Sequence, residues 1–117
     1  MDRNELKQYI LDNYNCEADH PWMKYPEYEV FRAKSSRKWF ALIMNISEDK
    51  LGLTDKEMLD VVNLKCDPFL IGELQREKGF FPAYHMSKTH WITVALTPDV
   101  SDDKIKMLVD MSFEAVK

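Results

Sequence analysis

A run of six consecutive apolar residues constrains the fold of this chain more than any other feature. Residues 39–44 read Trp-Phe-Ala-Leu-Ile-Met, so both faces of a strand at this place would be apolar. The run is strand-sized and far shorter than the ~20 residues that span a bilayer. It therefore predicts a central strand that is covered on both sides, with complete or partial cover on one of the two faces.

The residues before this strand predict its hairpin partner. From Tyr28 the apolar period changes to two, which places Tyr28, Val30, Arg32 and Lys34 on one face and Glu29, Phe31 and Ala33 on the other. Ser35-Ser36 is a turn. A β-hairpin between Tyr28 and Ile46 is therefore expected.

Three segments carry the start signals of helices. Asp2, with Glu5 three positions later, forms a capping box for a first helix that ends near Asn15-Cys16. Asp67-Pro68 reads as an N-cap followed by proline at the first helical position, and Lys78-Gly79 as the stop of that helix. Ser101 caps a last helix, whose apolar residues follow a 3.6-residue period: Ile105, Leu108, Val109, Phe113 and Val116.

The remaining patterns complete the predicted architecture. Strands are expected at about 58–64, 80–84 and 91–96, and the segment around Pro21 and Pro26 is a loop or an irregular edge strand. The order is then α-β-β-β-α-β-β-α, and helices packed on an antiparallel sheet bury every apolar face. We expect an α+β two-layer sandwich. The 117 residues fit one domain, 1–117.

The overall charge and the termini limit the functional classes. The formal charge is −4 and the pI is about 5.3, which disfavours a chain-wide nucleic-acid surface but allows a local basic patch. The N-terminus lacks a secretory signal and no apolar run spans a membrane, so a cytoplasmic protein without a membrane partner is expected. Cys16 and Cys66 are expected to be free thiols. Nothing resembles a dimerisation helix, so we expect a monomer.

Two short runs concentrate residue types that bind metals or catalyse reactions. They are Asn-Leu-Lys-Cys-Asp-Pro at 63–68 and Phe-Pro-Ala-Tyr-His-Met-Ser-Lys-Thr-His-Trp at 81–91. The close metal-ligand pairs are Cys16 with His20 and His85 with His90, and there is neither a CxxC nor an HExxH motif. Zinc sites usually combine two such pairs, so no metal or other cofactor is expected.

Thiol catalysis through Cys66, with His85 or His90 as the base, is a second interpretation of the two runs. Cys66 lies at a predicted strand end beside a helix cap, where a buried structural thiol is common. No phosphate-binding glycine motif is present either. A protein without enzymatic activity is therefore expected.

A local excess of basic residues supports a third interpretation. Residues 24–38 hold five basic and two acidic side chains, a net charge of +3 in a chain of −4. With Lys88, His85, His90 and Trp91 on a second hairpin, two basic hairpins would contact nucleic acid. The alternative is that these residues only solvate an edge hairpin, and the residues alone favour that alternative. Trp39 is expected in the core, and Trp22 and Trp91 half-exposed.

Several motifs in order resemble those of the MmcQ/YjbR family. They are Tyr25-Pro26, Val30-Phe31-Arg32, Lys38-Trp39-Phe40-Ala41, the run at 63–68, and residues 82–92. The resemblance covers nearly the whole chain, and the family usually has asparagine where this chain has Ser87. It implies a fold similar to the CyaY-like and secretion-chaperone-like sandwiches, with no established activity or cofactor.

The resemblance also implies a proposed DNA-binding role through a double wing of two β-hairpins. The residues that would form the wings are Arg32, Lys34, Arg37 and Lys38 on one side, His85, Lys88, His90 and Trp91 on the other, and Lys65 between them. The contacts would be mainly with phosphates. The alternative is a module that binds a protein or a small ligand and has no nucleic-acid role.

Overall fold

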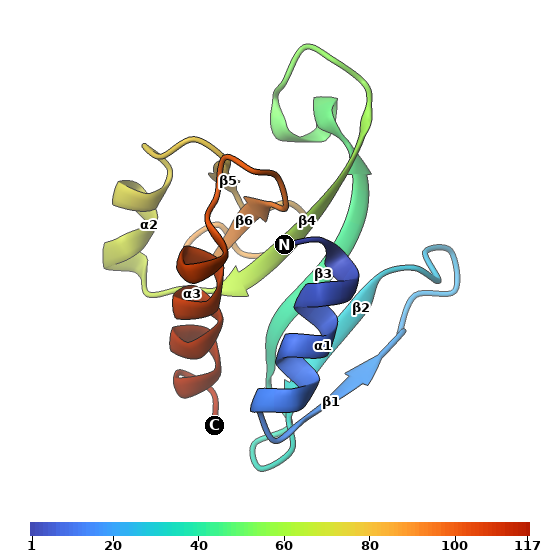
Figure 1. The fold of residues 1–117 in the computed structure, drawn as a ribbon, viewed down its shortest axis with the longest axis vertical. Helices are drawn as coiled ribbons and strands as arrows, with labels where there is room; N and C mark the ends of the chain where they lie inside the picture. The colour runs from blue at the N-terminus through green and yellow to red at the C-terminus, as the bar shows by residue number, and fades with distance from the viewer.

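The computed structural model describes residues 1–117, which form three α-helices, one short 3-10 helix and six strands (Figure 1). The elements in order are α1 (Arg3–Asn13), β1 (Cys16–Asp19), β2 (Glu29–Ala33), β3 (Trp39–Ser47), η1 (Glu48–Leu51), β4 (Met58–Lys65), α2 (Pro68–Leu74), β5 (Phe80–Pro82), β6 (Trp91–Ala95) and α3 (Asp102–Glu114). The predicted α+β class and order of elements are confirmed. β1 is an edge strand in the segment predicted as a loop or an irregular edge strand.

The six strands form one antiparallel sheet in the order β1-β2-β3-β4-β6-β5. The expected hairpin is β2–β3, and its register shifts between Phe31 and Arg32. Phe31 pairs with Ala41, whereas Arg32 pairs with Trp39. Phe40 is thus an extra residue on β3, which makes this site a β-bulge. The bulge places both Phe40 and Ala41 in the apolar cluster beneath the helices.

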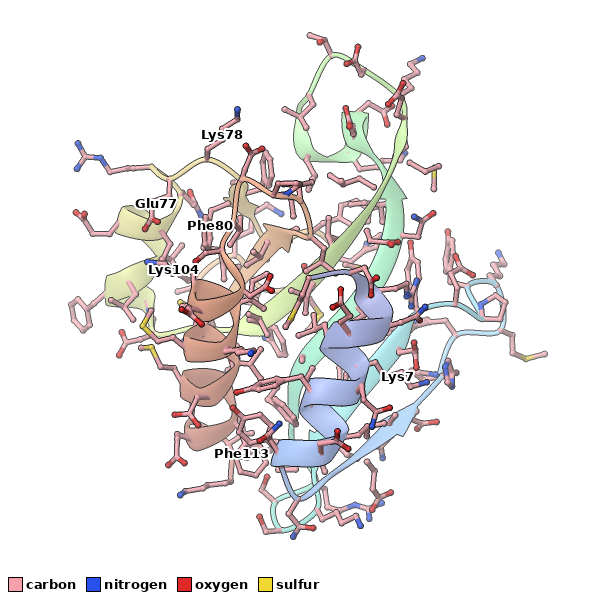
Figure 2. All side chains as sticks on the ribbon, viewed as in Figure 1. Lys7, Glu77, Lys78, Phe80, Lys104 and Phe113 are labelled. Atoms are coloured by element: carbon pink, nitrogen blue, oxygen red, sulfur yellow. The ribbon has the colours of Figure 1, made fainter.

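The larger apolar cluster, 21 buried residues, contains side chains of all three helices and of the sheet. In Figure 1, α1 and α3 lie in front of the sheet. Figure 2 shows Phe113 of α3 close to the lower end of α1, and its ring centroid lies 4.9 Å from that of Tyr14 and 5.2 Å from that of Phe40. These aromatic contacts join the two helices to β3.

The opposite face of the sheet, called here the open face, carries a second apolar cluster of six buried residues. Its members are Tyr28, Val30, Leu42, Met44, Ile46 and Val61. Side chains of two loops, including Trp22, Tyr84 and Met86, pack on it in place of helices. The prediction that residues 39–44 form a central strand covered on both sides is therefore confirmed.

The predicted helix caps are present. The Asp2 carboxylate accepts a hydrogen bond from Glu5 N at 2.8 Å, and the Glu5 carboxylate accepts one from Asp2 N at 3.0 Å. Asp67 Oδ1 accepts from Phe69 N, and Ser101 Oγ accepts from Lys104 N. None of the helices combines the length and the apolar character that crossing a membrane requires.

Candidate nucleic-acid interface

Both predicted wings lie at one end of the sheet. β2 ends at Ala33 and β3 begins at Trp39, so residues 34–38 form the tip between them. β4 ends at Lys65 opposite Trp91, the first residue of β6, and β5 ends at Pro82 opposite Ile92. Because Ala41 of β3 pairs with Leu64 of β4, the start of β3 lies beside the end of β4. The sheet thus brings residues 34–38, Lys65 and residues 83–90 to one end.

The tip at residues 34–38 is closed by backbone hydrogen bonds. Arg37 N donates to Ala33 O at 2.8 Å, and Ala33 N donates to Lys38 O at 3.0 Å. Arg37 adopts the left-handed conformation, with φ 66°. The side chains of Lys34 and Lys38 are exposed, and neither forms a salt bridge.

The two arginines of this wing have acidic neighbours on β1. The Arg32 guanidinium forms a hydrogen-bonded ion pair with Asp19, and Arg32 is half-buried. Arg37 lies 3.8 Å from Glu17 Oε1, with both side chains exposed, so this pair contributes little. Arg32 is therefore largely neutralised, whereas the positive charge of the tip comes from Lys34, Lys38 and in part Arg37.

Lys65 and Trp91 form a pair across β4 and β6. Lys65 Nζ lies 5.6 Å from the centroid of the Trp91 ring, a cation–π geometry. Trp91 is 6% exposed, so the prediction that it is half-exposed is wrong. Trp39, predicted in the core, is half-buried on the open face and packs edge-to-face on Trp22. Trp22 is half-buried, as predicted.

The second wing is a loop rather than a long hairpin, since residues 83–90 separate the short β5 from β6. His85, Lys88 and His90 are exposed. Lys88 Nζ donates to Ala83 O at 3.0 Å, and His90 N donates to Ser87 O at 3.3 Å. His85 has a left-handed φ of 65°, and its ring lies 4.0 Å from that of Tyr84.

The two sequence runs at 63–68 and 81–91 meet in the fold. Asn63 Nδ2 donates to Tyr84 O at 2.7 Å, and Thr93 Oγ1 donates to Asn63 Oδ1 at 2.5 Å. Tyr84 N in turn donates to Thr93 Oγ1 at 2.9 Å, and Cys66 N donates to His90 O at 2.8 Å. The first run therefore holds both ends of the loop that carries the second run.

Cys66 and His90 border one cavity of about 530 Å³ between the end of β4, the start of α2, and α3. Burial, and after it the neighbouring charge of Asp67, raises the pKa of the Cys66 thiol. Cys66 is 8% exposed, and its Sγ lies 3.6 Å from Asp67 O. Since the thiolate is the nucleophile, this environment suits a structural thiol. Both cysteines are free, as predicted.

A second cavity, of about 240 Å³, lies on the open face and was not predicted from the sequence. It is lined by Trp22, Tyr25, Tyr28, Leu42, Met44, His85 and Met86. The signal was the spacing of Trp22, Tyr25 and Tyr28, three aromatic residues three positions apart. Tyr25 N donates to Trp22 O and Tyr28 N to Tyr25 O, so consecutive turns bring the three rings to one side.

The sheet with helices on one face and two lysine-bearing loops at one end defines a small α+β domain. The YjbR family model matches residues 11–115, and the chain belongs to this family. The chain is similar to YyaQ of Bacillus subtilis (strain 168), with 36% identity over all of this chain and 99% of that protein. It is also similar to YjbR of Escherichia coli (strain K12), with 27% identity over 97% and 86% of the two chains.

Solved structures share this fold. The crystal structure of a Pseudomonas syringae protein superposes with a TM-score of 0.96 at 40% identity, and each chain is covered completely. The solution structure from the same organism gives a TM-score of 0.89 at 40% identity, covering 100% and 94%. A Deinococcus radiodurans protein at 23% identity, TM-score 0.75, covering 97% and 76%, shares the fold.

Proposed function

We propose that the protein binds DNA through the end of the sheet that carries residues 34–38, Lys65 and residues 83–90. The observation that carries this proposal is the common position of both lysine-bearing loops at that end, with Lys65 between them. We further propose that it acts as a monomer in the cytoplasm and without catalysis. The raised pKa of the Cys66 thiol, which disfavours the nucleophilic thiolate, supports the last point.

The spacing of the two loops supports contact with the two backbones that border a groove. In the sheet order, the middle of β2–β3 and the middle of β6–β5 are three strand spacings apart. At about 4.8 Å per spacing this is about 14 Å. The major groove of B-DNA is about 12 Å wide. One loop would thus contact each phosphate backbone, and Lys65 would face the groove.

The contacts would be electrostatic and largely independent of base sequence. Lys34, Lys38, Lys65 and Lys88 are free of salt bridges, which leaves their charges available for phosphate contacts. The net charge of −4 opposes long-range attraction. We therefore expect the affinity of non-specific binding, with a Kd of roughly 10⁻⁴–10⁻⁶ M at physiological salt.

Fluorescence anisotropy with a labelled duplex, measured at several salt concentrations, tests this function. If the four lysines each neutralise one phosphate, log K should fall with log salt with a slope of about −3.6. The double variant Lys34→Glu/Lys38→Glu should weaken binding strongly. Lys50→Glu/Lys56→Glu is the matched control, because both lysines are exposed near η1, at the opposite end of the sheet (Figure 1).

Three results would contradict DNA binding at this place. The first is a signal that does not depend on salt, and the second is no binding at low salt. The third is an equal loss in both double variants, which have the same charge change. Such a loss would show that only net charge matters and that the end with residues 34–38 has no special role.

A further inference from the structure

The cavity on the open face has the composition of a binding site for a planar ring. Its volume of about 240 Å³ is below the range of roughly 300–1,000 Å³ that holds drug-sized ligands, so it suits a single ring system. Three aromatic residues, two methionines and one leucine line it together with His85. No carboxylate and no lysine or arginine is among these residues.

One wall of the cavity is aromatic and rigid. The rings of Tyr25 and Tyr28 stack with centroids 4.7 Å apart and planes 11° apart. Trp22 stands edge-to-face against Tyr28 at 6.0 Å and against Trp39 at 5.7 Å. Each ring is thereby fixed by a neighbouring ring, so this wall is formed before a ligand arrives.

The other wall is formed by His85 and Met86, and its backbone is held in an unusual conformation. His85 is one of two non-glycine residues with a positive φ. The hydrogen bonds among Asn63, Tyr84 and Thr93 fix the residue just before it. A positive φ is rare for residues other than glycine. Where the surrounding hydrogen bonds fix it, it is typical of binding sites.

The methionine sulfurs and the aromatic faces favour an aromatic ligand over an aliphatic one. No carboxylate is in the lining, so a cationic ligand would be held by the aromatic faces alone. Both loops that line the cavity also carry an exposed lysine close to a lining residue: Lys24 precedes Tyr25, and Lys88 follows Met86 by two positions. Neither lysine forms a salt bridge, and Lys88 Nζ, which donates one hydrogen bond to Ala83 O, keeps two further N–H donors for an anionic group.

We propose that this cavity binds a planar heteroaromatic ring that carries a phosphate, which is the chemistry of a nucleotide. The ring lies between the aromatic wall and Met86, and the lysines of the two loops contact the phosphate. A free nucleotide and an unpaired base of a nucleic acid share this chemistry. The ring site itself does not depend on the proposed contacts of residues 34–38 with DNA.

NMR of protein labelled with ¹³C at the methionine methyl groups tests the proposal. Met44 and Met86 line the cavity, whereas Met58 at the start of β4 and Met107 on α3 are exposed outside it and serve as internal controls. On titration with AMP to about 10 mM, where binding with a Kd of about 1 mM is nearly saturated, the Met44 and Met86 signals should shift along a saturating curve. Equal shifts of all four signals, or none at Met44 and Met86, would overturn the proposal.

Two variants distinguish the contribution of the ring to binding from that of the phosphate. Tyr25→Ala removes a 43%-exposed ring and should weaken the binding of both AMP and adenosine by about tenfold. Lys24→Gln should weaken AMP binding but leave adenosine binding unchanged, with Lys56→Gln as the control of equal charge. Unchanged AMP binding in Tyr25→Ala would contradict the ring site. Equal effects of Lys24→Gln and Lys56→Gln would contradict the phosphate contact.

The source of the ring is decided by comparing AMP with two DNA duplexes. If the natural ligand is an unpaired base, a duplex with a single bulged adenine shifts Met44 and Met86 at lower concentration than AMP, and the matched duplex does not shift them. If it is a free nucleotide, only AMP does so. A shift by AMP together with an anisotropy titration that shows no DNA binding would refute the proposed function and leave this site standing.

Discussion

Asn63 is the residue at which the sheet is joined to the loop of residues 83–90. It is fully buried, and its amide group exchanges hydrogen bonds with Tyr84 and Thr93. A buried polar side chain is tolerated only when its hydrogen bonds are made, and here all three partners depend on one another. The start of the loop that carries His85, Lys88 and His90 is thus held by one amide on β4.

We predict that Thr93→Val destabilises the protein by about 1–3 kcal/mol, because Tyr84 N and Asn63 Oδ1 lose their partner in a buried place. Asn63→Ala should destabilise it by a similar or larger amount. The double variant should lose less than the two single losses added together, since both remove the same network. Urea unfolding of the four proteins measures this coupling, and additive losses would show that the two residues act independently.

At the scale of elements, the connection from α2 to β5 depends on one glycine. Gly79 has a φ of 92°, and a Cβ added to it would lie 2.5 Å from Val100 Cγ2. Gly79 O also accepts from Ala95 N at 2.8 Å, which fixes its backbone against β6. The predicted stop of α2 at Lys78-Gly79 lies a few residues beyond the observed end at Leu74.

The two glycines near α2 should respond oppositely to alanine. Gly79→Ala should destabilise the protein by at least about 2 kcal/mol, through backbone strain and the clash with Val100. Gly72 lies inside α2 with no atom within 4 Å of the added Cβ, so Gly72→Ala should stabilise it by about 0.5–1 kcal/mol. Thermal and urea unfolding measure both, and equal effects would mean that the α2–β5 connection is not held as described.

Most elements follow from local patterns, and the exceptions have physical reasons. The caps at Asp2, Asp67 and Ser101 are local interactions, so the sequence predicts them well. β1 buries only Cys16 and shows no alternation, so its four residues carry no strand signal. The bulge at Phe40 depends on pairing with β2, and a run that is apolar on both faces conceals it.

The candidate site was less predictable, because it depends on contacts between distant segments. The lysines of the two loops were found from composition, but the pairing of Arg32 with Asp19 requires the β1–β2 register. Trp91 is buried although it follows four exposed residues, so its burial depends on contacts that the local sequence does not show. The aromatic cavity draws on three segments and has only the spacing of Trp22, Tyr25 and Tyr28 as a local signal.

At the scale of the whole molecule, Glu29 joins the helix layer to the sheet. It lies on β2 and is 7% exposed. Arg3 Nη2 and Lys7 Nζ of α1 lie 3.2 Å and 2.5 Å from its carboxylate oxygens, and Figure 2 shows Lys7 on the side of α1 toward β1 and β2. His20 Nε2, in the loop after β1, lies 3.4 Å from Oε2. Three segments therefore meet at one carboxylate.

This carboxylate should make stability depend on pH in the acidic range. Burial alone would raise the pKa of Glu29, but hydrogen bonds and charge from Lys7 and then Arg3 outweigh it and lower the pKa. A lowered folded-state pKa means that the unfolded chain binds the proton more tightly. The stabilisation is therefore complete above the ordinary glutamate pKa of about 4.3 and is lost as the pH falls from there through the lowered value.

Urea unfolding between pH 7 and pH 3 isolates this contribution when Glu29→Gln is compared with its parent and both proteins carry His20→Gln, which removes the imidazole next to Glu29. The parent should be more stable than Glu29→Gln at pH 7, and the difference should stay constant down to about pH 5. Below that it should shrink, because a protonated Glu29 resembles glutamine. Glu57→Gln is the control, because Glu57 is an exposed residue before β4 that makes no salt bridge. It should leave the fall of stability below about pH 5 unchanged. A difference that persists at pH 3 would instead assign the role of Glu29 to packing, since loss of charge would then have no effect.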